Sequence, residues 1–589
     1  MSHHIIALLA ATLFVVGCAA QTRPPNRAAN ALHTQLDDDW KYWIAQYPEM
    51  GTAFGYPGQN ARWTDYSQPA IDARADYLKK SFDRLKAIGR GELEPEDQIN
   101  YDLYHELLET AVKGLEFHND AAPVKGVIPH NLLMPVNQME GVQQDIPRTI
   151  AMMPSNTRED YENIVLRLER VAPLVDQTIA LLQQGLAAKV TPPRITLRDV
   201  SGQVKAQIFD DPAKSPMLEA FSKMPALEDR AARAYKDVVV PAFTRLHQFL
   251  TSTYLPACRE TTDAASLPNG APMYAYNVKW HTTTNKTPAE IHEIGLAEVK
   301  RIRAEMDKVM DAAGFKGSYD EFKKFLRSDS RFYFKDAASM LVVYRDIAKR
   351  ADPELAHLFG RLPQTPYGVK AVPDAIAPSQ TTAYYDPGSF VAGRPGYMFA
   401  NTYKLESRPK WEMEALTLHE AVPGHHIQVS LAQELQGLPE FRKNSSYTAF
   451  VEGWGLYAES LGEEMGFYKD PYSRFGQLTY EMWRAIRLVV DTGLHSMGWT
   501  RDQAINFFRE NAAKTDQDII VEVDRYIVWP GQALGYKMGQ LKIQELRTKA
   551  EQQLGPRFDI RQFHDVVLGH GAVPLDLLEQ QVNAWVQMR

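Results

Sequence analysis

Apolar residues recur at every third or fourth position along most of this chain, a pattern typical of amphipathic α-helices. The longest run covers 163–189 and predicts one long helix, which Pro173 can kink. Similar runs cover 97–117, 227–250, 288–312, 501–511 and 539–551. Strand patterns are few, and the best is the aromatic stretch 396–403. The chain is therefore predicted to be mostly α, with a small β element ahead of a histidine cluster at 419–426.

The size of the chain permits more than one helical unit. Its 589 residues are 44% hydrophobic, which is enough for a large core. Proline and glycine clusters at 191–193, 267–270 and 362–366 interrupt the helical runs. We expect two helical lobes around a cleft, an N-terminal lobe over 37–270 and a catalytic C-terminal lobe over 271–589. The net charge of -8 and the lack of a basic block argue against nucleic acid as a partner.

The N-terminus has the pattern of an export signal. An apolar run over 5–16 is too short to span a membrane, although no Lys or Arg precedes it. The following Val15-Val16-Gly17-Cys18 resembles a bacterial lipobox. Residues 1–17 are therefore predicted to be a lipoprotein signal peptide, Cys18 the lipidated residue and 18–36 a tether.

A lipid on the mature N-terminus would anchor the protein to a membrane of the cell envelope. Ala19 after the cysteine resembles the sorting pattern of the outer membrane, with the protein facing the periplasm. Cys258 is the only other cysteine, so this interpretation excludes an intrachain disulfide.

The segment 419–426, His-Glu-Ala-Val-Pro-Gly-His-His, has the composition of a metal site. The familiar zinc helix carries ligands at i and i+4, but Pro423 occupies i+4 here. In an undistorted helix, i+6 lies about 240° round and i+7 lies about 10.5 Å along the axis. Neither position suits zinc bonds of about 2.0–2.1 Å. A bulge at 422–423 would bring His425 or His426 into phase; we favour His425 and keep His426 as a ligand or an outer hydrogen-bond donor.

A catalytic zinc has three protein ligands and an open position for water. Glu452 is the best third ligand, because the intervening chain permits a second helix that crosses under the site. One buried histidine is more often a core residue, but three beside a glutamate favour a metal. The predicted ligands are thus His419, His425 or His426, and Glu452. Glu459 is expected to accept a hydrogen bond from a ligand histidine, with a solvated helix face as the competing interpretation.

The residues 419–428, His-Glu-Ala-Val-Pro-Gly-His-His-Ile-Gln, and 452–459, Glu-Gly-Trp-Gly-Leu-Tyr-Ala-Glu, resemble the bacterial domain-of-unknown-function family 885. The matching segments also include 394–396, 401–402, 484–495 and 529–537. This resemblance implies a zincin-like helical metallopeptidase fold over the whole mature chain. The substrates of the family are largely unassigned, so the resemblance supports fold and chemistry more than biology.

A zinc-peptidase mechanism would use these residues as follows. Glu420 would take a proton from a zinc-activated water and return it to the leaving amine. The oxyanion needs a further donor, and the resemblance to helical zincin peptidases favours Tyr536, then Tyr526, because such enzymes carry a tyrosine in a Gly-Tyr-rich C-terminal stretch. His495 could serve similarly. The competing interpretation is core packing for both tyrosines and packing at a helix end for His495.

The aromatic stretch before the metal motif is a candidate for substrate binding. It could pair with a peptide backbone by edge addition, which would give binding roles to Tyr397, Asn401 and Thr402.

Basic residues near the C-terminus are a second candidate. Arg487, Arg525 and Lys537 could bind a substrate carboxylate, as a carboxypeptidase or dipeptidase requires. Buried ion pairs with Asp491 or Asp524 are the competing interpretation for the two arginines.

Together these patterns predict a metallopeptidase that holds one Zn²⁺ and hydrolyses short peptides, as a carboxypeptidase, dipeptidase or oligopeptidase. Two alternatives stay open: a metal-dependent hydrolase of a non-peptide amide or ester, and a noncatalytic binding lipoprotein on a zincin fold. The intact Glu420 argues against the second alternative. The expected partners are a peptide substrate and, through the lipid, a membrane.

Overall fold

The structure, a computed structural model, describes residues 26–123, 129–374, 377, 380–390 and 393–589. Helices make up 69% of it and strands 3%, which confirms the prediction of a mostly helical protein with a small sheet. Within these residues, no helix combines the length and apolar character needed to cross a membrane. The predicted signal peptide and Cys18 lie outside the described residues.

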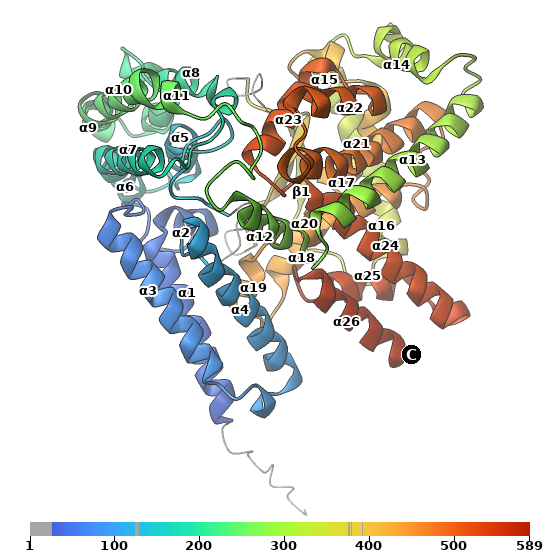
Figure 1. Ribbon diagram of the computed structural model, residues 1–589, viewed down its shortest axis with the longest axis horizontal. Helices are drawn as coiled ribbons and strands as arrows, with labels where there is room; N and C mark the ends of the chain where they lie inside the picture. Colours follow the sequence, from blue (N-terminus) through green and yellow to red (C-terminus); the bar gives the residue numbers. More distant parts are fainter. Residues whose placement is uncertain (1–25, 124–128, 375–376, 378–379, 391–392) are drawn as a thin grey trace, which may run out of the picture.

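Three long helices at the N-terminal end lie side by side (Figure 1). They are α1 (Arg27–Gln46), α3 (Gln68–Lys86) and α4 (Pro95–Gly114), and a short α2 (Pro48–Phe54) follows α1. The predicted tether ends before residue 36, because the side chain of Asn26 caps α1 and both Leu32 and Leu36 are buried. The core that buries these leucines includes C-terminal helices and runs across residue 270. The division into two lobes at that residue stays a prediction.

A second group of helices, α5 to α11, has a core of its own and is drawn in teal and green in Figure 1. The helix predicted over 163–189 is two helices, α6 (Arg158–Glu169) and α7 (Val171–Ala188). Pro173 explains the break, because it has no N–H and its ring would collide with the carbonyl of residue 169. The other members are α5 (Val142–Met152), α8 (Val200–Lys205), α9 (Pro225–Ala234), α10 (Val240–Phe249) and α11 (Leu255–Ala257).

Two closely packed helix pairs organise the rest of the chain. One pair is α13 (Pro288–Ala312) with α21 (Pro471–Ser496), and the other is α20 (Thr448–Ser460) with α24 (Leu534–Leu554). Both α20 and α21 also contact α17 (Met413–Glu420), so the three helices meet. The remaining helices are α12 (Gly270–Thr282), α14 (Tyr319–Ser328), α15 (Ala337–Ala351), α16 (Leu355–Leu358), α18 (His425–Glu434), α19 (Glu440–Asn444), α22 (Arg501–Asn511), α23 (Asp516–Val528), α25 (Ile560–Leu568) and α26 (Leu575–Gln587).

The small sheet has the strand order β1-β3-β2. Its strands are β1 (Tyr367–Ala371), β2 (Ala383–Asp386) and β3 (Gly396–Ala400). The predicted strand is therefore present as β3, but it is the central strand, parallel to β1 and antiparallel to β2. A peptide cannot add to β3 because both of its edges are already paired. The predicted edge addition along 397–402 is thus corrected, and β2 is the edge strand on that side of the sheet.

Candidate metal centre and its cavity

The histidine motif lies at a break between two helices. Helix α17 ends at Glu420 and α18 begins at His425, so residues 421–424 form a full break where the sequence predicted a bulge at 422–423. Gly424 is required there, because a Cβ at this position would lie 1.9 Å from the carbonyl oxygen of His419. The break turns the ring of His425 toward that of His419, and their centroids lie 4.7 Å apart.

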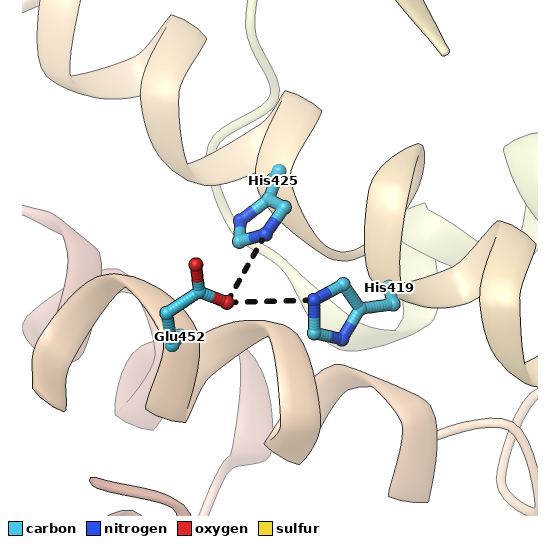
Figure 2. Close-up of side chains that lie close together, drawn as sticks. All are labelled: His419, His425 and Glu452. Atoms are coloured by element: carbon cyan, nitrogen blue, oxygen red, sulfur yellow. Dashed lines mark ion pairs between the residues drawn. The ribbon is translucent and has the colours of Figure 1, made fainter. Parts of the chain in front are cut away.

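Three potential metal ligands converge at this break (Figure 2). The Nε2 atoms of His419 and His425 each lie 3.6 Å from Oε2 of Glu452. One ligand atom from each residue lies within 4.8 Å of the other two, and among the described residues no other such group of His, Cys, Asp or Glu occurs. The structure therefore brings together His419, His425 and Glu452 as the sequence predicted.

His426 takes a different place from His425. Its Nδ1 lies 2.9 Å from the hydroxyl of Tyr385, and its ring packs on Tyr367 with centroids 4.6 Å apart. His426 is buried between α18 and the sheet, so its predicted role as an alternative ligand is corrected.

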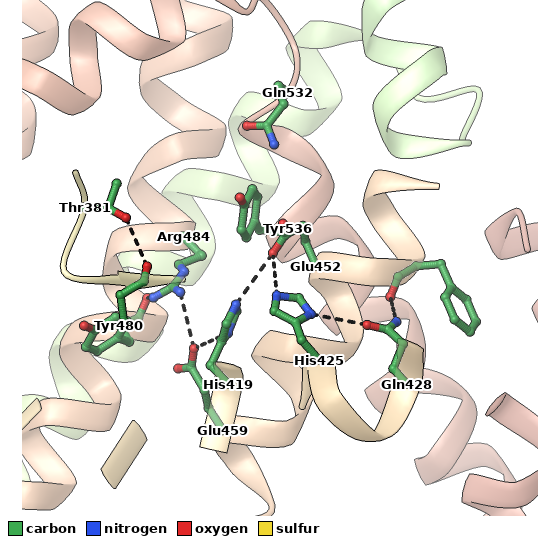
Figure 3. A network of polar contacts seen from close by, with 12 residues as sticks. Thr381, His419, His425, Gln428, Glu452, Glu459, Tyr480, Arg484, Gln532 and Tyr536 are labelled. Atoms are coloured by element: carbon green, nitrogen blue, oxygen red, sulfur yellow. Dashed lines mark hydrogen bonds and ion pairs between the residues drawn. The ribbon is translucent and has the colours of Figure 1, made fainter. Parts of the chain in front are cut away.

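Helix α20 contributes more than the candidate ligand Glu452. Two turns further on, the buried carboxylate of Glu459 accepts a hydrogen bond of 2.8 Å from Nδ1 of His419 (Figure 3). This leaves Nε2 of His419 facing Glu452, as a ligand nitrogen requires. Between the two glutamates, Gly455 gives the ring room, because a Cβ there would lie 2.8 Å from Cε1 of His419. His425 has its own Nδ1 partner, Oε1 of Gln428 at 3.3 Å.

The electrostatics of the three residues favour a positive charge between them. Burial lowers the pKa of His419, but contacts with Glu452 and Glu459 outweigh this and raise it to about 9. Burial raises the pKa of Glu452, but the imidazoles of His419 and His425 hold it well below its usual range. Protons and metal ions compete for the same imidazole nitrogens, so the arrangement that stabilises a proton also suits a cation.

The donor set fits zinc. Two imidazole nitrogens and one carboxylate oxygen are the usual protein ligands of a catalytic zinc. Bonds of about 2.0–2.1 Å at a tetrahedral angle separate two ligand atoms by about 3.4 Å, close to the 3.6 Å between Glu452 and each histidine.

The three residues line a cavity of about 280 Å³. Glu420, the last residue of α17, also lines it, next to the ligand His419. One rim is the segment Thr381–Tyr385, which includes the edge strand β2. Another wall comes from α21, α23 and α24. A larger cavity of about 410 Å³ lies among α2, α5 and α12, but it contains no metal-ligand group among the described residues.

Three of the predicted substrate or oxyanion residues, Arg487, Arg525 and Tyr536, lie in this wall, and both arginines contact the tyrosine. Nη2 of Arg525 donates a hydrogen bond of 3.1 Å to the hydroxyl of Tyr536. The guanidinium of Arg487 packs on the ring of Tyr536 at 4.3 Å and pairs with Glu522 at 2.9 Å. Arg487 therefore has a buried ion pair, but with Glu522 instead of the predicted Asp491 or Asp524. Those aspartates bond Tyr274 and Arg501 respectively.

Two predicted catalytic residues do not line the cavity. The hydroxyl of Tyr526 bonds Glu522 at 2.8 Å and Arg487 at 3.0 Å, below the wall. The two ring nitrogens of His495 bond the backbone N–H of Ala264 and the carbonyl of Tyr526, both at 3.0 Å. Both side chains are buried, and their positions correct the prediction that they act on a substrate.

The other predicted binding residues contact other parts of the protein and do not face the cavity. Lys537 is buried and its Nζ lies 2.9 Å from Glu298 and 2.8 Å from Glu481. The amide of Asn401 donates to the backbone carbonyls of residues 377, 380 and 381. None of Lys537, Asn401, Tyr397 and Thr402 lines the cavity.

Sequence reasoning missed part of the cavity wall. Glu522 precedes Arg525 and Tyr526 by three and four residues, the spacing at which helix side chains meet, and this signal could have indicated their contact. Arg484 stands three residues before Arg487 on α21. The rim at 381–385 gave no usable signal, because β2 has only four residues.

Residues 48–582 match a family whose description is bacterial protein of unknown function, DUF885. The chain belongs to the DUF885 family. A search of curated proteins found no match for this DUF885 chain.

Solved structures share the fold of this DUF885 protein. One, described as a candidate lipoprotein from Colwellia psychrerythraea, has a TM-score of 0.87 and 28% identity over 95% of this chain and 100% of that chain. A second, described as a candidate lipoprotein of unknown function from Shewanella oneidensis, has a TM-score of 0.65 and 16% identity over 94% and 99% of the two chains. Metallocarboxypeptidase 1 of Trypanosoma cruzi aligns with a TM-score of 0.32 and 9% identity over 95% and 96%, a likeness too weak to carry an argument.

Proposed function

We propose that this protein is a zinc-dependent, zincin-like metallopeptidase that hydrolyses short peptides. The observation that carries this proposal is the convergence of His419, His425 and Glu452 on one cavity that also contains Glu420. A binding protein would need the ligands but not a further carboxylate beside them. Glu420 therefore favours hydrolysis over binding alone.

The chain supplies the acid–base groups of such a reaction. A zinc ion, when bound, acts as a Lewis acid that polarises the substrate carbonyl and lowers the pKa of water. Glu420 accepts the proton of the attacking water and returns it to the leaving amine. Glu459 holds His419 in one tautomer and one orientation throughout, through the 2.8 Å hydrogen bond to Nδ1.

Tyr536 is suited to stabilise the oxyanion. Its oxygen accepts a hydrogen bond from Arg525, and its own O–H has no acceptor among the described residues, so it can donate into the cavity. A donor next to a guanidinium stabilises developing negative charge more than an isolated hydroxyl does.

The edge strand β2 is suited to position the peptide. It lines the cavity, and on its outer side no described strand pairs with it. A substrate that adds to this edge would be held by backbone hydrogen bonds, which do not depend on its sequence. This role replaces the one that the sequence predicted for the stretch 397–402.

We further propose that Cys18 carries a lipid that anchors the protein in the cell envelope, at the outer membrane and facing the periplasm. The lipobox-like sequence and the descriptions of the Colwellia and Shewanella proteins support this. Mass spectrometry of the mature protein should find diacylglyceryl-Cys18 at its N-terminus, and an unmodified Cys18 would contradict the proposal.

The peptidase proposal is tested on the purified protein without its first 25 residues. Zinc content is measured by elemental analysis, and a mixed peptide library is incubated with the wild type and with Glu420→Gln. We expect one zinc per chain in both and cleavage by the wild type alone, because the substitution removes the base and leaves the ligands. Zinc without cleavage of any peptide would overturn the proposal in favour of a different hydrolase or a binding protein.

A further inference from the structure

The cavity wall formed by α21 and α23 contains three arginines of different exposure. The side chains of Arg484 and Arg487 are 7% and 4% exposed, and that of Arg525 is 14% exposed. Arg484 bonds the carbonyl of Tyr480 and lies 3.4 Å from Glu459. These contacts hold Arg484 in the cavity wall.

The charges of this wall do not balance. Glu522 forms ion pairs with two arginines, because it lies 2.9 Å from Arg487 and 3.5 Å from Arg525. Glu459 forms contacts with both Arg484 and the candidate ligand His419. Three guanidiniums therefore share two carboxylates, and one positive charge is left over. Glu452 belongs to the candidate metal-ligand group and Glu420 lines the cavity beside it, so a divalent cation bound there would offset the charges of these two carboxylates.

Arg525 is the most exposed of the three arginines. Arg484 and Arg487 also each have one nitrogen, Nε and Nη1, without a hydrogen-bond partner among the described residues, but these nitrogens belong to side chains that are more deeply buried. A guanidinium has five N–H groups. Those of Arg525 make three contacts with described residues, at 3.5 Å to Glu522, 3.0 Å to Gln532 and 3.1 Å to Tyr536. Its Nε has no hydrogen-bond partner among the described residues. A guanidinium in this state has the charge and the geometry to take one more carboxylate.

We propose that Arg525 binds the C-terminal carboxylate of the peptide, so that this protein releases one or two residues from the C-terminal end of its substrates. This inference rests on the proposed peptidase function. Arg525 contacts Tyr536, which is placed to bond the oxygen of the reacting carbonyl, and their atoms are 3.1 Å apart. A carboxylate on Arg525 therefore lies close to the scissile bond, within the reach of one or two residues at about 3.3–3.6 Å each.

The size of the cavity agrees with a short segment beyond the scissile bond. Its volume of about 280 Å³ is just below the range for small-molecule sites, about 300–1,000 Å³. An Asp or Glu side chain of the substrate carries a carboxylate of the same chemistry. The terminal carboxylate is favoured because every peptide has one at a fixed distance from its last bonds.

The test compares three peptides on the zinc-loaded protein: trialanine, trialanine amide and Ala-Ala-Asp amide. We expect kcat/KM for trialanine to exceed that for trialanine amide by about 100-fold, as for the loss of a buried charged hydrogen bond. Ala-Ala-Asp amide should be as poor as trialanine amide. Equal rates for trialanine and its amide would overturn the inference and leave the peptidase function intact. A rate for Ala-Ala-Asp amide equal to that for trialanine would also overturn it, in favour of an acidic side chain.

Arg525→Gln should reduce the preference for trialanine over its amide to within about threefold, because the substitution removes the charge. Arg501→Gln is the matched control: Arg501 lies outside the cavity and also bonds an aspartate, Asp524 at 2.6 Å. This control should keep the full preference. A preference that persists in Arg525→Gln would overturn the assignment of this residue.

Binding to Glu420→Gln, measured by titration calorimetry, separates the two proposals. Trialanine should bind about 100-fold more tightly than its amide even though no cleavage occurs. If the wild type cleaves no peptide but this difference is found, the peptidase function fails and the carboxylate site stands. Equal binding of the two peptides would overturn the site.

Discussion

Nδ1 of His419 lies 2.8 Å from Oε1 of Glu459, a carboxylate that is buried below the candidate metal centre. Both residues were predicted from the sequence, but their contact fixes which ring nitrogen remains for a metal. The orientation of His419, the first candidate ligand, is thus set by α20, the helix that also supplies the candidate ligand Glu452.

Glu459→Gln should lower zinc affinity by about 10–100-fold, because the neutral amide stabilises the imidazole orientation less well than a carboxylate. Competition with a chromophoric chelator measures the dissociation constant. Glu463→Gln is the control, since this glutamate pairs with Arg474 near the surface of the same region and should leave the affinity unchanged. Equal affinities for both variants would show that the hydrogen bond does not tune the site.

His425→Ala and His426→Ala should differ in zinc content. We expect His425→Ala to lose stoichiometric zinc, because it removes one of the three converging ligands. His426→Ala should keep it, since that ring bonds Tyr385 and packs on Tyr367. Elemental analysis of both purified variants checks this, and the reverse result would assign the ligand to His426.

Gly455→Ala should weaken zinc binding by at least about tenfold and destabilise the fold by about 1–3 kcal/mol, because the added methyl group would overlap the ring of His419. Chelator competition and urea denaturation give the two quantities. Gly202→Ala is the matched control in helix α8, where an added Cβ meets no atom within 4 Å. The control should be neutral or slightly stabilising. A similar loss in both variants would contradict the crowding argument.

His495 should make the protein sensitive to acid. Burial lowers its pKa in the folded state to about 4, below about 6.5 for an unfolded chain. Between these two pKa values the unfolded state binds more protons than the folded state. The contribution of neutral His495 to stability is therefore complete above pH 6.5 and is lost as the pH falls toward 4. The free energy of unfolding falls by roughly 3 kcal/mol over this pH range.

Urea denaturation between pH 4 and pH 7.5 measures this effect. His495→Gln should be less stable at pH 7 by about 1–3 kcal/mol, because two buried backbone groups lose a partner, and its stability should decline less on acidification. His357→Gln replaces an exposed histidine and should follow the wild type. An unchanged slope in His495→Gln would assign the acid sensitivity to other groups.

The candidate metal ligands could be predicted from the sequence because few residue types bind zinc and their positions along the chain are short-range information. Pro423 and Gly424 also indicated that the helix had to change direction between His419 and His425. The surroundings of each basic residue in the folded protein could not be predicted in this way. Lys537 and Arg525 have the same charge, and only the fold decides that one meets Glu298 and Glu481 while the other faces the cavity.

The sheet shows the same limit. The aromatic pattern identified β3, but strand order depends on contacts between residues far apart in the sequence. The strand at the edge on the cavity side is the short β2. Its four residues are too few to show a recognisable strand pattern in the sequence. For the same reason His495 was predicted as catalytic, since its bonds to Ala264 and Tyr526 join segments distant in the chain.

Helix α20 presents Glu452, Gly455 and Glu459 to a single imidazole on α17. An ion held between these helices would couple its own binding energy to their docking, because displacing α20 would remove a ligand and the support of another ligand in one movement. The concentration of free zinc then becomes a variable of folding, and each tenfold increase above the dissociation constant stabilises the docked state by about 1.4 kcal/mol. Hydrogen exchange at α17 and α20 should slow on zinc addition more than exchange in α6 or α7, which share a separate core.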